Sequence, residues 1–479
     1  MSAFAGSDRY LVDQGRELRL SPEIWSLLLL VCIMAYASEA TLYLIYAGLV
    51  FYALRGTRQA LQALTLSWFV LYLTPAFFET MGFSANMRWP ILAIACFVVT
   101  REFRGLGIRG IKALQRLGLF AVVLALLAVK SSILPTTSLL KIVQFGLGAA
   151  TIICGAYVLA FKRLDLEKWF YNLFLFIVVM GLLLYPTEYA FVRNQRGFQG
   201  LLSHPQTYGI FLGPMLAWLI GSLFLARIKP PFLPFAIIMG IFSLFASQAR
   251  TGLVAIVLAC LATGFCFFVF RKNQAQTLVK VRINPAKIVG VTALLATLLV
   301  FVPAVRNQMM LFIVKEGRPT NLEEGFQLSR GFLIDRSMEN FRRSPMTGMG
   351  FGTPSDLEFL YVNTLTSSPT EKGFLPSAIL EETGIIGTLC FVVFLGALSA
   401  PIVTYAPLQF VLLYFAAIFV NIGEMILFSF GGIGLYTWLI IGVALTSAIR
   451  VILLEHEGRR AAQMPPNDAD STGAAGATA

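Results

Sequence analysis

The sequence predicts an all-α fold: a polytopic bundle of transmembrane helices with one large external loop that is itself partly helical. Of the 479 residues, 57% are hydrophobic and only 13% are charged, and the mean hydropathy is +0.76. Soluble domains carry roughly 25% charged residues, which excludes an ordinary globular enzyme. Apolar runs long enough to cross a bilayer recur almost from end to end.

Apolar run length and the charged breaks between runs predict about 12–14 membrane spans. The fourteen candidate runs lie near residues 24–37, 41–54, 61–78, 89–101, 117–133, 138–161, 169–187, 207–226, 231–247, 252–270, 288–304, 375–400, 407–426 and 433–450.

Lysine and arginine in the loops predict the orientation, because cytoplasmic loops carry an excess of both. The tails and alternate loops hold 23 of the 37 Lys and Arg residues, whereas the opposite short loops hold six. Both termini are therefore expected in the cytoplasm. The net charge of +12 is mainly this topology signal, so no nucleic-acid partner is expected.

These assignments divide the chain into five parts. They are a cytoplasmic tail (1–23), helices with short loops (24–304), a large periplasmic loop (305–373), C-terminal helices (374–452) and a cytoplasmic, disordered tail (453–479). Within the loop, apolar residues at helical spacing predict a helix over "SRGFLIDRSMENFRR", begun by Ser329 and ended by the Pro and Gly residues of "SPMTGMGFG". Arg330 lies on the predicted apolar face, where a buried arginine needs an anion.

Several cations occur on the external side, where the orientation rule disfavours them. Arg193, Arg196 and His204 lie close together in one short loop, and Arg250 stands in "SQARTG" at the mouth of a span. Arginine suits bidentate contact with phosphate oxygens, so these residues indicate an anionic substrate headgroup. Anchoring to lipid headgroups is the alternative, and a histidine before a proline is also typical of a loop-structuring residue.

Carboxylates gather near the same side. Glu371 and Lys372 stand at the mouth of the next span, Glu381 and Glu382 lie about two turns further in, and Glu424 is near the external end of its span. Charges inside a span are costly and face a polar interior. Partnership of each glutamate with a neighbouring arginine is the structural alternative to a catalytic role.

Together these motifs resemble the superfamily of bacterial O-antigen ligases and O-antigen or exopolysaccharide polymerases. The resemblance rests on "HPQTYG", "SQARTG", the loop motif "SRGFLIDRSMENFRRSPMTGMGFG" and "EKGFLPSAILEETGIIG", and it covers roughly residues 185 to 430. It implies a GT-C-like membrane glycosyltransferase of the bacterial inner membrane. The substrates implied are donor and acceptor glycans carried on undecaprenyl diphosphate, with reaction on the periplasmic side.

The resemblance also implies site residues. Arg193, Arg196 and Arg250 would hold the diphosphate, with Arg330 and Lys372 as further candidates. Ligases of the superfamily carry a catalytic His in a His-Asn pair eleven residues before a glycine of the last large span. Counting back from Gly384 gives Gly373, followed by Phe374, and this departure favours a polymerase.

The predicted reaction is a metal-independent, inverting transfer that needs no cofactor, in which arginines stabilise the leaving diphosphate. Membrane lipids are expected around the protein, and a chain-length regulator stays open as a further partner. Ligation to a lipid or protein acceptor is the alternative within the class, and a flippase for lipid-linked glycans is the alternative outside it. For the base that accepts the hydroxyl proton, we rank Glu371 first, His204 second and Glu424 third.

The topology can be tested with reporter fusions. A reporter placed between Glu316 and Thr366 should be periplasmic, and one placed after Arg450 should be cytoplasmic, because the loop charges set this orientation. Cytoplasmic labelling of the first fusion would overturn the predicted orientation.

Overall fold

The computed structural model describes residues 19–76, 81–191, 197–225, 232–270, 331–355 and 372–463, and within these ranges it contains helices and no strand. The α-helices in chain order are α2 (Pro22–Ala37), α3 (Glu39–Ala53), α4 (Thr57–Leu71), α5 (Met81–Gly105), α6 (Lys112–Ser131), α7 (Pro135–Phe161), α8 (Glu167–Leu184), α9 (Pro205–Leu225), α10 (Leu233–Ser247), α11 (Arg250–Phe270), α16 (Phe332–Arg343), α17 (Leu375–Tyr405), α18 (Leu408–Phe419) and α19 (Gly434–Gln463). Two short 3-10 helices are η1 (Glu188–Phe191) and η4 (Val420–Ile422). The predicted all-α fold is confirmed.

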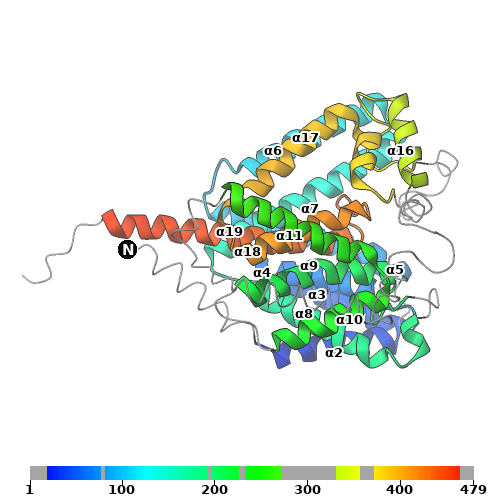
Figure 1. The fold of residues 1–479 in the computed structure, drawn as a ribbon, viewed down its shortest axis with the longest axis vertical. Coiled ribbons are helices and arrows are strands. Elements are labelled where there is room, and N and C mark those ends of the chain that lie inside the picture. The colour runs from blue at the N-terminus through cyan, green and yellow to red at the C-terminus, as the bar shows by residue number, and fades with distance from the viewer. Residues whose placement is uncertain are drawn as a thin grey trace, which may run out of the picture.

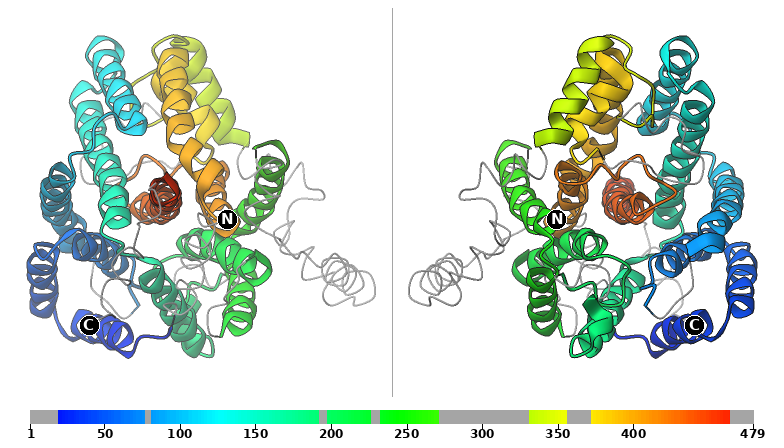
Figure 2. Two further views of the ribbon diagram at one scale, coloured as in Figure 1. Left: turned by 90° about the vertical axis from the view of Figure 1, so that its left-hand side faces the viewer. Right: turned by 90° about the vertical axis from the view of Figure 1, so that its right-hand side faces the viewer.

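Helix α19 lies at the centre of the bundle. Seen end-on it is surrounded by the other helices (Figure 2), and it packs against α4, α7, α17 and α18. Its apolar window is 78% buried inside the protein, against 28% for α6 and for α17. Helices α6, α7 and α17 form a lobe at the top of Figure 1, with α16 at one end of it.

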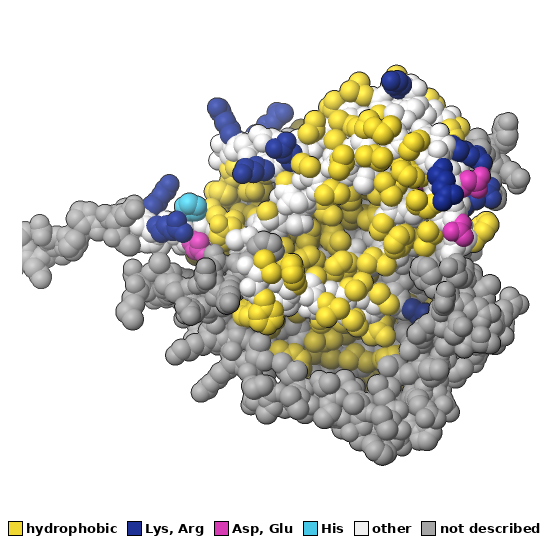
Figure 3. All heavy atoms as spheres, turned by 45° about the horizontal axis from the view of Figure 1, so that its top comes forward, with side chains coloured by type: hydrophobic (Ala, Val, Ile, Leu, Met, Phe, Trp, Pro, Cys, Tyr) yellow, Lys and Arg dark blue, Asp and Glu magenta, His cyan; other side chains and the backbone are white. Residues whose placement is uncertain are grey.

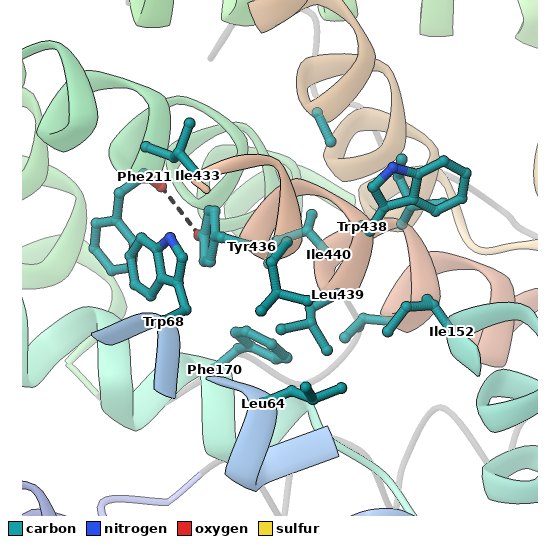
Figure 4. Close-up of a cluster of buried hydrophobic side chains, with 14 of the residues drawn as sticks. Leu64, Trp68, Ile152, Phe170, Phe211, Ile433, Tyr436, Trp438, Leu439 and Ile440 are labelled. Carbon is teal, nitrogen blue, oxygen red and sulfur yellow. Dashed lines mark hydrogen bonds between the residues drawn. The ribbon is translucent and has the colours of Figure 1, made fainter. Parts of the chain in front are cut away.

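An aromatic cluster holds α19 in place (Figure 4). The ring of Tyr436 stacks on Trp68 of α4 with centroids 4.8 Å apart, and Phe211 of α9 lies 5.1 Å from the same ring. The Tyr436 hydroxyl donates to the backbone carbonyl of Phe211 at 3.1 Å. One buried tyrosine thus joins three helices and satisfies its own polar atom, as a phenol inside a bilayer must.

Seven described helices are long and apolar enough to cross a membrane, namely α6, α7, α8, α9, α11, α17 and α19. Thirteen of the fourteen predicted runs coincide with described helices, and the run at 288–304 lies outside the described residues. The space-filling view agrees, because an apolar band separates charged side chains at its two ends (Figure 3). The chain is a multi-pass membrane protein.

Ion pairs mark one end of the bundle. Lys162 lies 2.7 Å from Glu102, and Arg450 contacts Glu167 at 3.8 Å and also donates to the carbonyl of Leu164. These residues come from α5, α8, α19 and the connection between α7 and α8, so those helix ends lie together. Following the orientation predicted from the loop charges, we call this the inner end, and we call the opposite end, which carries α16, the external end.

The C-terminal tail corrects one expectation. The sequence predicts disorder over 453–479, but α19 continues to Gln463. Glu457 pairs with Arg163 at 3.1 Å, and Glu455 pairs with Arg459 one helical turn away at 3.8 Å. These contacts support helix beyond the apolar span, which hydropathy alone does not register.

Asn421 holds the irregular stretch of chain that follows α18. Its amide nitrogen donates to the carbonyls of Ala417 and Ile418 at 3.2 and 3.1 Å. Its Oδ1 accepts from the N–H groups of Ile426 and Leu427 at 3.1 and 2.7 Å. One buried side chain therefore satisfies four backbone groups where the helix stops.

Replacing Asn421 by Ala should destabilise the protein by at least about 2 kcal/mol, because buried N–H groups left unpaired cost about 1–3 kcal/mol each. Thermal unfolding of the purified protein in detergent measures the effect. Asn86→Ala is the matched control, since Asn86 is exposed. Equal melting temperatures for the two variants would contradict this role.

Candidate functional site

Helix α17 is broken at Gly384, and a loop segment fills the break. Gly384 has φ 61° and ψ −169°, a conformation essentially restricted to glycine. In a regular helix the N–H groups of Ile385 and Ile386 would bond to the carbonyls of Glu381 and Glu382. The break separates these four groups, and in a membrane each would be costly if left unpaired.

Residues 345–350 supply all four partners, and we call this segment the clasp. The N–H groups of Met349 and Gly350 donate to the carbonyls of Glu381 and Glu382 at 2.8 and 3.1 Å. In return, the carbonyls of residues 345 and 346 accept from the N–H groups of residues 385 and 386 at 2.9 and 3.3 Å. The clasp thus inserts between the two halves of α17 and replaces two lost helical bonds with four.

Glycines make this close approach possible. A Cβ on Gly348, whose φ is +72°, would lie 2.5 Å from backbone atoms of Glu382. A Cβ on Gly384 would overlap the backbone of Met346. The sequence predicts that "SPMTGMGFG" ends a helix, and in the structure the same residues also complete another helix.

A buried charge cluster lies under the clasp. The ammonium of Lys372 is 3.0 Å from Glu382 Oε1 and 3.3 Å from Glu381 Oε2, and all three side chains are at most 3% exposed. These are ionic contacts rather than aligned hydrogen bonds. The N–H of Gly352 donates to Glu382 at 2.7 Å, and Lys141 of α7 donates to the Gly352 carbonyl at 2.7 Å. Within the described residues the ionic partner of both glutamates is thus a lysine, whereas the structural alternative names an arginine.

Helix α16 docks onto this cluster through polar side chains. Ser337 donates to Glu381 Oε2 at 2.8 Å and Asn340 donates to Oε1 at 2.7 Å, while Ser355 donates to Oε2 at 2.9 Å. The predicted helix is confirmed, but the expectation of a buried apolar face is wrong at Phe332, which is 67% exposed. The buried face is polar because it covers a carboxylate.

The polypeptide around the clasp also reaches the membrane core. Phe351, which is buried, lies 6.1 Å from Phe145 of α7 and 5.0 Å from Phe428, measured between ring centroids. The N–H of Ile133, between α6 and α7, donates to the Met349 carbonyl at 3.1 Å. Helices α6, α7, α16 and α17 are therefore joined through one short stretch of chain.

Arg250 is the first residue of α11 and is half-buried at the external end. A cation at a helix N-terminus opposes the positive end of the helix dipole, and no carboxylate within the described residues pairs with it. The free backbone N–H groups of a helix N-terminus and an arginine side chain both attract anions. The arrangement is unfavourable by itself and becomes favourable when an anion binds.

His204 stands immediately before α9 and caps it. Its Nδ1 accepts from the N–H of Gln206 at 3.1 Å, and its carbonyl accepts from the N–H of Tyr208 at 3.0 Å. With Nδ1 acting as an acceptor, the neutral imidazole carries its proton on Nε2. In this tautomer Nε2 is a donor, and the catalytic role of His204 stays a prediction.

Two close contacts bring His204 and Glu424 to the helix end that bears Arg250. Gly197 is packed so closely that an added Cβ would lie 2.9 Å from Cγ of Pro205, the residue after His204. The same Cβ would lie 3.1 Å from the carbonyl oxygen of Ser247, three positions before α11. An added Cβ on Gly423, the residue before Glu424, would overlap the side chain of Thr251, the second residue of α11. Glu424 itself is buried, with 3% of its surface exposed. The structure thus gathers three predicted residues around the start of α11.

Glu371, Arg193, Arg196 and Arg330 lie outside the described residues, so their roles stay predictions. Lys372 is described, and its ion pairs give it a structural role beside the predicted phosphate contact.

Two residues of the structure, Asn421 and Lys141, are not predicted from the sequence. No local signal identifies either one, because an asparagine or a lysine near a span end has many ordinary roles. Lys141 and its partner Gly352 are 211 positions apart, so only the folded chain brings them together.

The fold and this site define a multi-pass helical membrane protein with an ordered external helix and, at its external end, an arginine without an acidic partner in the described ranges. Residues 235–392 match the family model described as O-antigen ligase. This match is consistent with the O-antigen ligase and polymerase superfamily that the motifs of the chain resemble. The matched region contains Arg250, the clasp and the break in α17. No curated protein matches the chain.

Replacing Gly384 by Ala should open the clasp, because the added Cβ overlaps Met346 and alanine cannot adopt the glycine conformation. We expect a loss of at least about 2 kcal/mol from overpacking and backbone strain. Hydrogen exchange should rise over residues 344–355 and α16. Gly396→Ala in the same helix is the control, since nothing lies within 4 Å of its Cβ position. Identical exchange in both variants would show that the clasp does not depend on Gly384.

Proposed function

We propose that this protein polymerises undecaprenyl-diphosphate-linked oligosaccharide repeat units into a surface polysaccharide on the periplasmic side of the bacterial inner membrane. Members of the family are membrane glycosyltransferase-like enzymes. The observation that carries the proposal is Arg250, a cation at the N-terminus of α11 without a carboxylate partner in the described ranges. Such a position suits a diphosphate whose charge grows as the glycosidic bond breaks.

The proposed reaction is inverting and metal-independent. A sugar hydroxyl of the acceptor attacks the anomeric carbon of the donor, the bond to the diphosphate breaks, and the diphosphate leaves with the electron pair. Arg250 binds the leaving diphosphate, with Arg193, Arg196 and Arg330 as further ligands. A carboxylate takes the hydroxyl proton.

Of the three candidate proton acceptors, His204 has a described contact that bears on the choice. The Nδ1 of His204 already accepts an N–H, so we assign its Nε2–H as a donor to the diphosphate. The base is then Glu371, the first-ranked carboxylate, with Glu424 near Arg250 as the alternative. Ligation to a lipid or protein acceptor uses the same donor chemistry and differs in the acceptor.

Purified protein supplied with one lipid-linked repeat unit tests the proposal. A polymerase gives a ladder of products, a ligase gives a single transfer to an added acceptor, and a flippase gives no new glycosidic bond. A single product, or none, would overturn polymerisation.

In this assay Arg250→Ala should lower polymer yield at least about tenfold, because a hydrogen bond to a charged group contributes about 1.5–3 kcal/mol. Arg250→Lys should restore little, because the bidentate geometry is lost. Arg342→Ala, which alters an exposed arginine of α16, is the control. Equal yields from Arg250→Ala and Arg342→Ala would remove Arg250 from the site.

A further inference from the structure

Helices α9 and α11 cross at backbone contact close to their N-terminal ends. An added Cβ on Gly209 of α9 would overlap Cβ of Ala249, the residue before α11. One turn further on, an added Cβ on Gly213 would lie 3.1 Å from Cα of Gly252. Glycines four positions apart that face small residues allow two membrane helices to approach this closely. The crossing therefore has no room for a larger side chain at position 209.

The two helices run in the same direction through this crossing. Gly209 lies against Ala249 and Gly213 lies against Gly252, so the residue numbers rise together along both helices. Their N-terminal ends are therefore on the same side of the crossing. Arg250 follows Ala249 directly, and its Cα–Cβ bond is tilted toward the N-terminus of α11, as in any α-helix.

A short turn joins Arg250 to the end of α10. Helix α10 ends at Ser247, so only Gln248 and Ala249 separate it from Arg250. Gln248 adopts the left-handed conformation with φ 54°, and the N–H of Ala249 donates to the hydroxyl of Ser247 at 3.3 Å. Because the turn is this short, a displacement of Ala249 also moves Arg250.

The start of α9 is fixed by the segment that precedes it. The N–H of Phe198 donates to the carbonyl of Ala246 in α10 at 3.1 Å, and the N–H of Ser203 donates to the carbonyl of Tyr72 at 2.8 Å. The apolar window of α9 is 78% buried inside the protein, against 33% for α11. A side chain added at the crossing should therefore displace α11 rather than α9.

We infer that Gly209 and Ala249 are positioning residues, whose contact sets the start of α11 and so holds Arg250 at the diphosphate. The inference rests on the proposed function, because it acts through Arg250. Position 209 must be glycine for this purpose, since any Cβ there pushes Ala249 away from α9. A misplacement of about 1 Å at a site that stabilises charge can lower a rate about a hundredfold.

The test measures the binding of radiolabelled undecaprenyl diphosphate to purified full-length protein in phosphatidylcholine nanodiscs. Gly209→Ala should bind at least about tenfold more weakly than wild type, because the charge-assisted contact of Arg250 is lost. Gly264→Ala is the control in α11, since nothing lies within 4 Å of its Cβ position. Equal affinities of folded Gly209→Ala and Gly264→Ala proteins would overturn the inference.

A compensating variant tests the contact itself. Gly209→Ala combined with Ala249→Gly moves the methyl group from one side of the crossing to the other. The new Cβ then lies 3.4 Å from Cα of residue 249, which is ordinary van der Waals contact. This double variant should recover the affinity of wild type, and a folded double variant that binds as weakly as Gly209→Ala would contradict the inference.

A double-mutant cycle separates positioning from a general structural role. Arg250→Gln removes the group through which Gly209 acts, so adding Gly209→Ala to it should weaken binding no further. A further tenfold loss in the folded double variant would show that Gly209 acts through another group and would overturn the inference.

Gly213→Ala keeps the test valid if Gly209→Ala does not fold. Its Cβ would meet Gly252 at 3.1 Å, which needs a shift of only a few tenths of an ångström. Melting temperatures within the range of Gly264→Ala identify folded variants. Folded Gly213→Ala should bind more weakly than Gly264→Ala, and equal binding would count against positioning by the crossing.

The product ladder distinguishes failure of this inference from failure of the proposed function. Wild type that shows all these binding effects but makes no ladder would refute polymerisation and leave the positioning role standing. A ladder from wild type, together with unchanged binding by folded Gly209→Ala, would refute the positioning role alone.

Discussion

A backbone N–H or C=O that leaves a helix inside a bilayer must find its partner within the protein, and the structure of the external end depends on how that requirement is met. At the break in α17 the partners are backbone groups of the clasp. After α18 they belong to the side chain of Asn421. Before α9, the N–H of Ser203 donates to the carbonyl of Tyr72 at 2.8 Å. The first and third of these irregular segments are thus tied to a distant part of the chain, and the second is held by a side chain at its own start.

The spans were predictable from the sequence, because hydropathy reports a property of each segment by itself. Helix α16 was also predictable from its spacing, but its buried face was not. Ser337 and Asn340 face inward because Glu381 lies opposite them, and a carboxylate 44 or 41 positions further along the chain leaves no mark on the local pattern of a helix. The charged residues could therefore be located from the sequence, whereas their pairing required the fold.

In the candidate site, too, some features can be found in the sequence and others appear only in the fold. Arg250 stands out in the sequence because a cation on the external side breaks a general rule of membrane topology. Ordinary imidazole chemistry makes His204 a candidate base, whereas the bond from Gln206 to Nδ1 gives it the tautomer of a donor. The residue type indicates which charge or proton a side chain can carry, and the fold determines which groups that side chain contacts.

The charges of the external end fall into two groups with different environments. Lys372 pairs with both Glu381 and Glu382 in the protein interior, where breaking such a set is costly. Arg250 has no carboxylate partner in the described ranges and is partly exposed. The first group fixes the framework, and the second is the cation to which the proposed function assigns an anion.

The order of the clasp and α17 along the chain bears on biosynthesis. Residues 345–350 leave the ribosome before residues 375–405, so the partners for the break have been translated before the break itself exists. The exposed carbonyls of Glu381 and Glu382 therefore need not wait for any later part of the protein to satisfy them. If the two segments came in the reverse order, the backbone groups at the break in α17 would stay unpaired in the membrane until the clasp was made. Because synthesis proceeds from the N-terminus, a segment that pairs with the broken helix is made in time if it precedes that helix in the sequence.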